Sequence, residues 1–302
     1  MVIGSRGSQL ALWQAEWAKD RIEADGIGDV AIEVIRTEGD HNQAEAFTRI
    51  EGKGVFTKEV DEALLSERTD LSVHSLKDLP TELSPGLVLA AVSPRADVRD
   101  ALIAREGWTL SGLCEGAKVA TSSLRRQALL IALRPDLELQ PLRGNVDTRL
   151  QKFRKGSLDG IVLASAGLDR LGLEDAITER LDPEIFVPAP GQAAMGIVCR
   201  EDDRNTVDAV SCLNDPEVRL AVDVERSALN RLGGGCRIPF GAWARKEGES
   251  ITVDGVVSHP DGSSPIRKRI SGAAEHVVEL GVQLAEALLA DGANTILDEV
   301  LA

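Results

Sequence analysis

One stretch of the sequence, KVATSSLRRQALLIALRP (residues 118–135), passes directly from a strand pattern into a helix pattern. Residues 118–121 are a short run with a β-branched core, bounded by turn residues, which predicts a strand. Apolar residues then recur with helical spacing from residue 123 to residue 133, and Pro135 ends the pattern. Because a strand followed at once by a helix is the building unit of α/β domains, we predict an α/β fold here.

The same alternation continues on both sides of this stretch, through the first two thirds of the chain. Strands are predicted at residues 30–35, 70–74, 87–92 and 160–164, and helices at residues 10–24, 58–67 and 145–155. This order is typical of sheets with mostly parallel strands. Beyond Asp215 the pattern changes to a long helix (216–232), strand-like runs (238–245, 250–258 and 264–270) and a helical end (272–302). We expect a separate α+β domain there.

The composition is that of a globular protein. The chain has 302 residues, of which 43% are hydrophobic, enough for two or three domains with cores of their own. It has no apolar run long enough to span a bilayer and no signal-peptide pattern at its start, so we expect a cytoplasmic location and no membrane partner. A net charge of −15 with 3% aromatic residues argues against nucleic acid as a partner.

The cysteines are four in number and widely separated: Cys114, Cys199, Cys212 and Cys236. No pair has C-x-x-C spacing, and no histidine pair at metal-ligand spacing accompanies them. We therefore predict reduced thiols and no metal site, with the first three cysteines structural.

Positive charge is concentrated in one region of this acidic chain. Residues 121–155 hold eight basic side chains against three acidic ones, a local balance of +5. The basic residues are Arg125, Arg126, Arg134, Arg143, Arg149, Lys152, Arg154 and Lys155. They are spread over several short elements, so a single solvated helix face explains them poorly. The pattern favours a site for small carboxylates or phosphates.

Two strand-to-helix junctions in this region carry the residue types of an anion-binding site. At the first, Thr121 and Ser123 supply hydroxyl groups, and Arg125 and Arg126 follow in the first helical turn. Free backbone N–H groups and the helix dipole favour negative charge at a helix N-terminus, and arginine adds a planar fork for a carboxylate. The second junction, residues 143–149, repeats the arrangement with an arginine at each end. We predict that both junctions bind anions.

Lys77 and Asp78 stand where a predicted strand ends, which is where α/β folds place their binding sites. The alternative for two adjacent charged residues is a surface ion pair worth about 0–1 kcal/mol. His74, in the same segment, is expected to be a buried core residue and not a ligand.

A glycine-rich loop presents the fourth cysteine. In the run GGGCRIPFG (residues 233–241), three glycines leave the backbone open to close approach by a ligand, and Pro239 stiffens the exit. Cys236 is then either a thiol presented to a bulky group or a small hydrophobic residue that faces inward. This segment alone does not separate the two interpretations.

Eight segments of the sequence together resemble the porphobilinogen deaminase (hydroxymethylbilane synthase) family. They are residues 4–15, 52–59, 74–80, 121–127, 143–149, 166–172, 190–192 and 233–241. Their order and spacing match along essentially the whole chain. Each motif alone is weakly specific, whereas eight in sequence make an accidental match very improbable.

The resemblance implies two doubly wound α/β domains, similar to the lobes of solute-binding proteins with a cleft between them, and a smaller C-terminal α+β domain. Residues 1–93 and 194–212 would form a discontinuous first domain, residues 98–189 the second, and residues 216–302 the domain that anchors the cofactor. Proline and glycine near residues 93–94 and 188–191 mark the expected hinges.

The resemblance also implies a transferase of tetrapyrrole (porphyrin and haem) biosynthesis. It would condense four porphobilinogen molecules head to tail, with release of ammonia, to give hydroxymethylbilane. The growing polypyrrole would be built on a dipyrromethane cofactor, attached by a thioether to the cysteine of the glycine-rich loop, here Cys236. Members of this family are typically monomers, and they need no metal or nucleotide.

Matched position by position, the resemblance assigns roles to further residues. Asp78 would be the catalytic carboxylate, which stabilises the cation left when ammonia departs and accepts hydrogen bonds from pyrrole N–H groups. The cofactor would be held by Lys77, Thr121, Ser123, Arg125, Arg126 and Arg149. The incoming substrate would be held by Arg6, Ser8, Arg143, Arg149 and Arg170. Since each pyrrole ring carries an acetate and a propionate, the basic region would have a ligand of opposite charge.

Three positions depart from the family pattern. Gly233 stands where glutamate is frequent, Ala193 where glycine is usual, and Arg49 where a lysine can occur. The alanine puts the flexibility of a predicted hinge in question, and Gly233 the bracing of the cofactor loop. Residues 40–56 are a candidate lid.

Two other functions stay open. A two-lobed protein could use the same arginines to bind a dicarboxylate without catalysis, and a cysteine-dependent transferase or hydrolase could use Cys236 as its nucleophile. The missing signal-peptide pattern and the Cys236 loop argue against the first. No histidine is placed by sequence to activate Cys236, which argues against the second.

Overall fold

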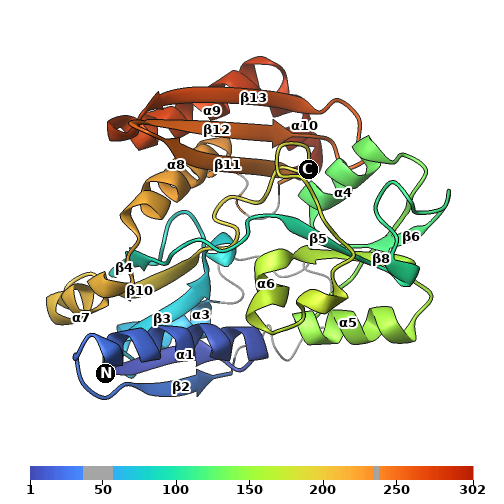
Figure 1. The fold of residues 1–302 in the computed structure, drawn as a ribbon. Coiled ribbons are helices and arrows are strands. Elements are labelled where there is room, and N and C mark those ends of the chain that lie inside the picture. Colours follow the sequence, from blue (N-terminus) through green and yellow to red (C-terminus); the bar gives the residue numbers. More distant parts are fainter. Residues whose placement is uncertain (37–56, 234, 236–237, 302) are drawn as a thin grey trace. The chain divides into compact units, whose positions relative to one another are not determined.

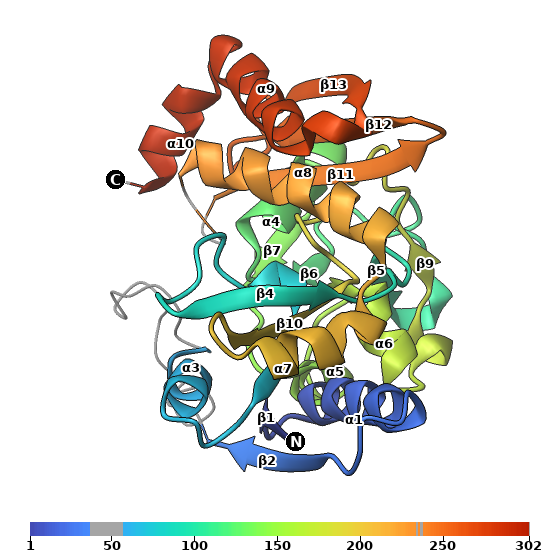
Figure 2. The same cartoon turned by 90° about the vertical axis from the view of Figure 1, so that its left-hand side faces the viewer.

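The computed structural model describes residues 1–36, 57–233, 235 and 238–301 (Figures 1 and 2). Backbone contacts divide the chain into two compact units. The first unit consists of residues 1–96 and 194–219, and the second of residues 97–193 and 220–302. Within the described ranges, no helix is long and apolar enough to cross a membrane.

The first unit is built on a five-stranded sheet in the order β2-β1-β3-β10-β4. Its strands are β1 (Val2–Arg6), β2 (Ala31–Ile35), β3 (Leu71–Ser75), β4 (Leu87–Val92) and β10 (Met195–Arg200). β1 runs parallel to β2 and β3, whereas β10 is antiparallel to β3 and β4. Its helices include α1 (Gln9–Ala24), α3 (Lys58–Leu65) and α7 (Arg204–Ala209).

Helices α1 and α3 lie on opposite faces of this sheet. α1 buries Ala18 and Ile22 against Ile3 of β1, while α3 packs on Ile35, which lies beside the next residue of β1, Gly4. Successive side chains of a strand point to opposite faces, so the two cores are separated by the sheet. At the edge of the sheet where β1 and β3 end, the last residues of the two strands, Arg6 and Ser75, are polar.

The second unit contains a sheet in the order β7-β6-β8-β5-β9. Its strands are β5 (Asp100–Ala104), β6 (Lys118–Ala120), β7 (Glu138–Gln140), β8 (Gly160–Ala164) and β9 (Glu179–Arg180). β6 is parallel to β7 and β8, and β5 is antiparallel to β8 and β9. Helix α4 (Leu124–Leu133) shares a core with Leu102, and α5 (Val146–Lys155) and α6 (Ser165–Arg170) share one with Ile103, so helices cover both faces.

The C-terminal part of the second unit is an antiparallel sheet, in the order β11-β12-β13, covered by helices (Figure 1). Its elements are α8 (Pro216–Leu232, of which residues 220–232 belong to this unit), β11 (Phe240–Glu247), β12 (Ser250–Val257), β13 (Ile266–Ala273), α9 (Val277–Ala290) and α10 (Ala293–Leu301). Leu284 and Leu288 of α9 join Ala228 of α8 in its core. The other face packs on the preceding sheet, because Val256 belongs to the core around α4 and Trp243 packs against the same core. At the edge of the C-terminal sheet, Ala242 N of β11 donates to Pro188 O at 2.9 Å.

The predicted fold class is confirmed, since two helix-covered five-stranded sheets are followed by a smaller α+β part. The expectation of mostly parallel strands is confirmed, since four of the five strands in each large sheet run in the same direction. The exceptions are β5 and β10, which run antiparallel to both of their neighbours and were not predicted. Both strands follow a point where the chain passes from one unit to the other, which local periodicity does not register. The three-domain boundaries and the cleft stay predictions.

Candidate active site

The Lys77–Asp78 pair lies on a 3₁₀ turn, Leu76–Asp78, directly after β3. Leu76 and Leu79 are 1% and 2% exposed, and both pack over Gly196 of β10, where an added Cβ would come within 3.0 Å of each side chain. The backbone N–H of Leu76 also donates to Ala194 O at 3.0 Å. Because the apolar residues hold the turn, Asp78 is presented to solvent and Lys77 is half-buried.

The same edge of the first sheet carries the two other predicted site residues of this unit. Arg6 is the last residue of β1, which is parallel to β3, so both strands end at this edge. Ser8 is the N-cap of α1, and its Oγ accepts a hydrogen bond from Ala11 N at 3.2 Å. Because this Oγ acts as an acceptor toward the backbone, the hydroxyl keeps its own proton to donate. Arg6, Ser8, Lys77 and Asp78 are therefore gathered at one sheet edge.

Gln14 is a residue of this edge that the sequence analysis missed. It is 2% exposed on α1, and its Nε2 donates to Ser75 Oγ at 2.9 Å, immediately before the turn that carries Asp78. The available signal was a polar residue within the buried stripe of a predicted helix. Gln14 thus ties α1 to the end of β3.

His74 is buried, as predicted for a core residue, and its Nε2 lies 2.8 Å from Ser72 Oγ. Burial, with a smaller contribution from the positive charge of Arg6, lowers the pKa of His74 to about 4. The imidazole is therefore neutral at pH 7, and protonation is unfavourable in the folded protein.

This shift predicts a loss of stability in acid. Below the ordinary pKa of 6.5, His74 of the unfolded chain is protonated. In the folded protein His74 stays neutral until the pH falls to about 4. The free energy of unfolding therefore falls through this window, by about 3 kcal/mol from this residue, and no further below it. Urea unfolding is measured at pH 7 and pH 4. Between these two pH values, the free energy of unfolding should fall more for the wild type than for His74→Gln. The exposed His276→Gln serves as control and should match the wild type; equal drops in all three proteins would refute the prediction.

In the second unit, Thr121 and Ser123 shape the junction between β6 and α4. Thr121 is buried, and its Oγ1 accepts a hydrogen bond from Ser123 N at 3.3 Å. Ser123 is the N-cap of α4, and its Oγ accepts one from Arg126 N at 3.5 Å. Each hydroxyl oxygen accepts a hydrogen bond from a backbone N–H group, so each hydroxyl proton remains available for donation to an anion.

Arg125 and Arg126 lie inside the protein. They are 4% and 6% exposed, and both contact the fully buried Asp100, Arg125 Nη2 at 2.8 Å from Oδ2 and Arg126 Nη2 at 2.7 Å from Oδ1. Arg125 Nη1 also donates to Val187 O at 2.8 Å, and Arg126 Nη1 to Val162 O at 3.1 Å. The two arginines are thus fixed by internal partners. Asp100, the residue that brings them together, was not predicted from the sequence.

The six other basic residues of the 121–155 region differ in exposure, and three of them, Lys152, Arg154 and Lys155, are exposed in the last turn of α5. Arg134 pairs with Asp136 and donates to Leu110 O at 2.6 Å, so it fastens the end of α4. Arg143 and Arg149 are half-buried at the start of α5, where Arg149 Nε donates to Gly144 O at 2.6 Å. The region is consequently not one continuous basic surface, and its junctions differ in exposure.

Arg170 is the last residue of α6 and is partly buried. Burial lowers its pKa to about 10, which leaves it charged at pH 7, and its Nη2 donates to Ala193 O at 2.7 Å. Ala193 has φ of +74°, a left-handed conformation that costs a residue with a Cβ roughly 1 kcal/mol or more. From the family resemblance, glycine is expected at this position.

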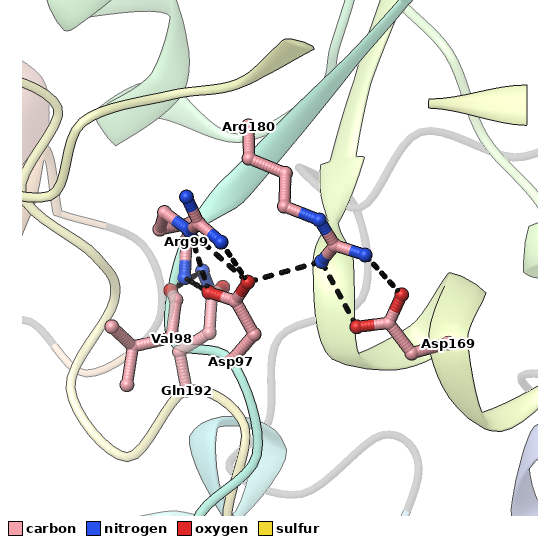
Figure 3. Close-up of polar contacts among 6 residues, drawn as sticks. All are labelled: Asp97, Val98, Arg99, Asp169, Arg180 and Gln192. Atoms are coloured by element: carbon pink, nitrogen blue, oxygen red, sulfur yellow. Dashed lines mark hydrogen bonds and ion pairs between the residues drawn. The ribbon is translucent and has the colours of Figure 1, made fainter. Parts of the chain in front are cut away.

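A network of ion pairs fixes the neighbouring residue of α6, Asp169 (Figure 3). Arg180 of β9 pairs with Asp169 at 2.6 Å and with Asp97 at 3.1 Å, and Arg99 pairs with Asp97 at 2.7 Å. Hydrogen bonds from Arg99 lower the pKa of Asp97 despite its partial burial. The network therefore joins the entry to β5 with the end of α6.

Cys236 and the candidate lid, including Arg49, lie outside the described residues. Of the other cysteines, Cys114 and Cys212 are exposed, whereas Cys199 is buried and its pKa is raised by burial to about 12. Among the described residues, no group of histidine, cysteine, aspartate and glutamate side chains is arranged to hold a metal ion.

Family profiles match almost the whole chain. The profile "Porphobilinogen deaminase, dipyromethane cofactor binding domain" matches residues 1–208, and "Porphobilinogen deaminase, C-terminal domain" matches residues 219–290. The chain belongs to the porphobilinogen deaminase family. This membership confirms the family predicted from the eight sequence segments, and the first profile agrees with the predicted dipyrromethane cofactor.

Proteins named porphobilinogen deaminase align with the chain from end to end. The protein from Trichlorobacter lovleyi is 46% identical over 299 residues, which cover 99% of this chain and 96% of that one. The protein from Geobacter sulfurreducens is 44% identical over 299 residues, with 99% and 94% covered. The protein from Brevibacillus brevis is 44% identical over 301 residues, with 99% and 97% covered.

Solved structures of solute-binding proteins show a more distant similarity. For the methionine-binding protein MetQ, the match covers 72% of this chain and 91% of that one, with 17% identity and a TM-score of 0.44. For a periplasmic substrate-binding protein of an ABC transporter from Coxiella burnetii, the match covers 72% of this chain and 94% of that one, with 17% identity and a TM-score of 0.45.

Proposed function

We propose that this protein condenses four porphobilinogen molecules head to tail, releases ammonia at each step and forms hydroxymethylbilane for tetrapyrrole biosynthesis. The observation that carries the proposal is the family match through both units, with named relatives that align over 99% of the chain. We further propose a monomeric cytoplasmic enzyme that needs neither a metal nor a nucleotide, with the three domains set out above.

The described residues of the second unit suit a ligand with several carboxylates. Arg125 and Arg126 bring two positive charges to the single carboxylate of Asp100. Within the part of the chain that the structure describes, Arg125 Nε is buried without a hydrogen-bond partner. A dipyrromethane group carries an acetate and a propionate on each ring, so its charge complements this surplus. When bound, it supplies the pyrrole carbon on which the product chain grows.

We assign the residues of the site as the family pattern suggests. The cofactor is attached to Cys236 and held by Lys77, Thr121, Ser123, Arg125, Arg126 and Arg149. The substrate is held by Arg6, Ser8, Arg143, Arg149 and Arg170. The hydroxyl and guanidinium donors bind carboxylates, and each hydrogen bond to a charged group contributes about 1.5–3 kcal/mol.

Asp78 acts as the catalytic carboxylate. As ammonia leaves the aminomethyl group of porphobilinogen, positive charge develops on the substrate, and a carboxylate at about 4 Å lowers its energy by about 4 kcal/mol at an effective dielectric constant of about 20. What supports this role is the position of Asp78, exposed on an anchored turn at the edge shared with Arg6 and Ser8. The rigid turn keeps the charge in place before the reaction begins.

The proposal is tested with the purified full-length protein and porphobilinogen. We expect ammonia release and formation of a linear tetrapyrrole, and an intact mass that exceeds the sequence mass by one dipyrrole unit. A chain of unmodified mass that binds porphobilinogen without releasing ammonia would instead support a dicarboxylate-binding protein. Release of a single ring product by an unmodified chain would support a cysteine-dependent hydrolase.

A further inference from the structure

Asp100 contacts three side chains, those of the adjacent residues Arg125 and Arg126 and that of the distant Gln192. It is the first residue of β5 and is 0% exposed. Its Oδ2 lies 2.8 Å from Arg125 Nη2, and its Oδ1 accepts hydrogen bonds from Arg126 Nη2 at 2.7 Å and Nε at 3.0 Å. The same Oδ1 accepts one from Gln192 Nε2 at 3.1 Å.

We propose that Asp100 is a positioning residue, held in turn by Gln192, that fixes the guanidinium groups of Arg125 and Arg126 for the carboxylates of the dipyrromethane cofactor. The inference rests on the proposed function, because it takes from it the role of the two arginines. It adds two residues to the site, neither of which needs to touch cofactor or substrate.

The charge balance of the cluster favours an anionic ligand. Two arginine residues that are 4% and 6% exposed face one carboxylate, which leaves one positive charge uncompensated among these three side chains. An uncompensated buried charge is destabilising. Burial, reinforced by the charge of Arg126, lowers the pKa of Arg125, and Asp100 opposes this shift. Without Asp100 the arginines would repel each other, and with it they retain a net charge for a carboxylate.

The surrounding contacts make the arrangement rigid. The carbonyl oxygens of Val187 and Val162 each accept from one arginine, and the Arg125 guanidinium lies 5.8 Å from the centre of the Phe186 ring. A side chain that is ordered before its ligand arrives does not lose rotamer freedom on binding. Asp100 is the contact that the two arginines share, so removing it releases both.

Gln192 connects this cluster to the neighbouring segments. Its Nε2 also donates to Val98 O at 2.8 Å (Figure 3). The preceding residue, Gly191, donates its N–H to the Oε2 of Glu225 at 2.7 Å, and Oε1 of this buried carboxylate accepts from Ala244 N at 2.7 Å. Glu225 lies on α8, which ends at the glycine-rich loop. The helix that leads to Cys236 is thus linked through adjacent residues to Asp100.

The test compares Asp100→Asn and Gln192→Met with the wild type, all as purified full-length proteins. Intact mass gives the fraction of chains that carry the dipyrrole, and turnover is expressed per loaded chain. We expect Asp100→Asn to load poorly and its loaded fraction to turn over at least about tenfold more slowly, since a hydrogen bond to a charged group is lost. The KM for porphobilinogen should change less than about twofold, because the affected arginines hold the cofactor. Gln192→Met should show the same pattern more weakly.

Asp254 provides a matched control. It also pairs with two arginines, at 2.6 Å from Arg245 Nη1 and 2.6 Å from Arg269 Nε, but on the C-terminal sheet. Asp254→Asn should lower the melting temperature without changing loading or turnover per loaded chain. A merely structural Asp100 would behave in the same way.

A double variant distinguishes the proposed positioning role from two independent destabilising effects. Because Gln192 acts through Asp100, adding Gln192→Met to Asp100→Asn should reduce turnover further by less than about twofold. Normal loading and turnover of folded Asp100→Asn would overturn the inference, as would fully additive effects. If Asp100→Asn does not fold, the test rests on Gln192→Met. Normal loading and turnover of Gln192→Met would overturn the inference, and a decrease in both would support it. A wild type without any adduct would overturn the proposed function itself.

Discussion

Asp78→Asn is expected to fold, to carry the cofactor and to turn over porphobilinogen at least about a hundredfold more slowly than the wild type. The substitution keeps the size of the side chain and removes its charge. A carboxylate beside the developing cation is worth about 4 kcal/mol, which corresponds to roughly three decades of rate, and the amide dipole and bound water replace only part of it. The measurement is ammonia release under saturating porphobilinogen, normalised to the fraction of loaded chains from intact mass.

The structure explains why the loss should be catalytic and not structural. Asp78 is exposed, while the turn itself is held by Leu76 and Leu79 on Gly196. Asp78→Asn should therefore melt within a few degrees of the wild type. Asp20→Asn, which removes an exposed carboxylate from α1, should keep full activity. Turnover of Asp78→Asn near that of Asp20→Asn would remove Asp78 from the mechanism.

Cys236→Ser is expected to abolish both the dipyrrole adduct and the activity. A serine hydroxyl is a much weaker nucleophile than a thiolate at neutral pH, so the thioether has no equivalent in the variant. Intact mass should equal the sequence mass, and ammonia release should fall to background. The matched control is Cys212→Ser, which removes an exposed thiol of this chain and should retain adduct and activity.

Alkylation of the native and unfolded protein gives an independent readout. In the loaded wild type we expect Cys114 to react readily and Cys212 more slowly, because partial burial raises the pKa of Cys212. Cys199 should react only after unfolding, since it is buried and its pKa is about 12. Cys236 should stay protected even in the unfolded chain, because the proposed thioether would leave no free thiol at this position. Alkylation of all four cysteines of the active wild type on unfolding would contradict the thioether.

The elements predicted from periodicity agree closely with the structure where the pattern is local. The predicted strand at residues 118–121 and helix at residues 123–133 are β6 and α4, within one residue at each end. Strand β5 was missed because it begins with Asp100. A carboxylate at a fully buried strand position is unfavourable until arginines from another element pair with it.

Strand β10 was missed for a related reason. It contains Gly196, which weakens a strand pattern, and the glycine is accommodated because Leu76 and Leu79 of a distant turn cover it. In both strands the decisive partners are far away in the sequence. No window of neighbouring residues contains this information.

The sequence by itself determined the family and located the two junctions at which basic and hydroxyl residues gather, and it gave the prediction that Cys236 carries the cofactor. These are local motifs whose order along the chain is sufficient to recognise them. Only the tertiary structure decided how the basic residues are used: Arg125 and Arg126 are buried on Asp100, while Arg143 and Arg149 are half-buried at the next junction. Asp100 is separated from Arg126 by 26 positions and from Gln192 by 92. The physical reason is that a buried carboxylate is stable only with its partners in place, and those partners are brought together by folding.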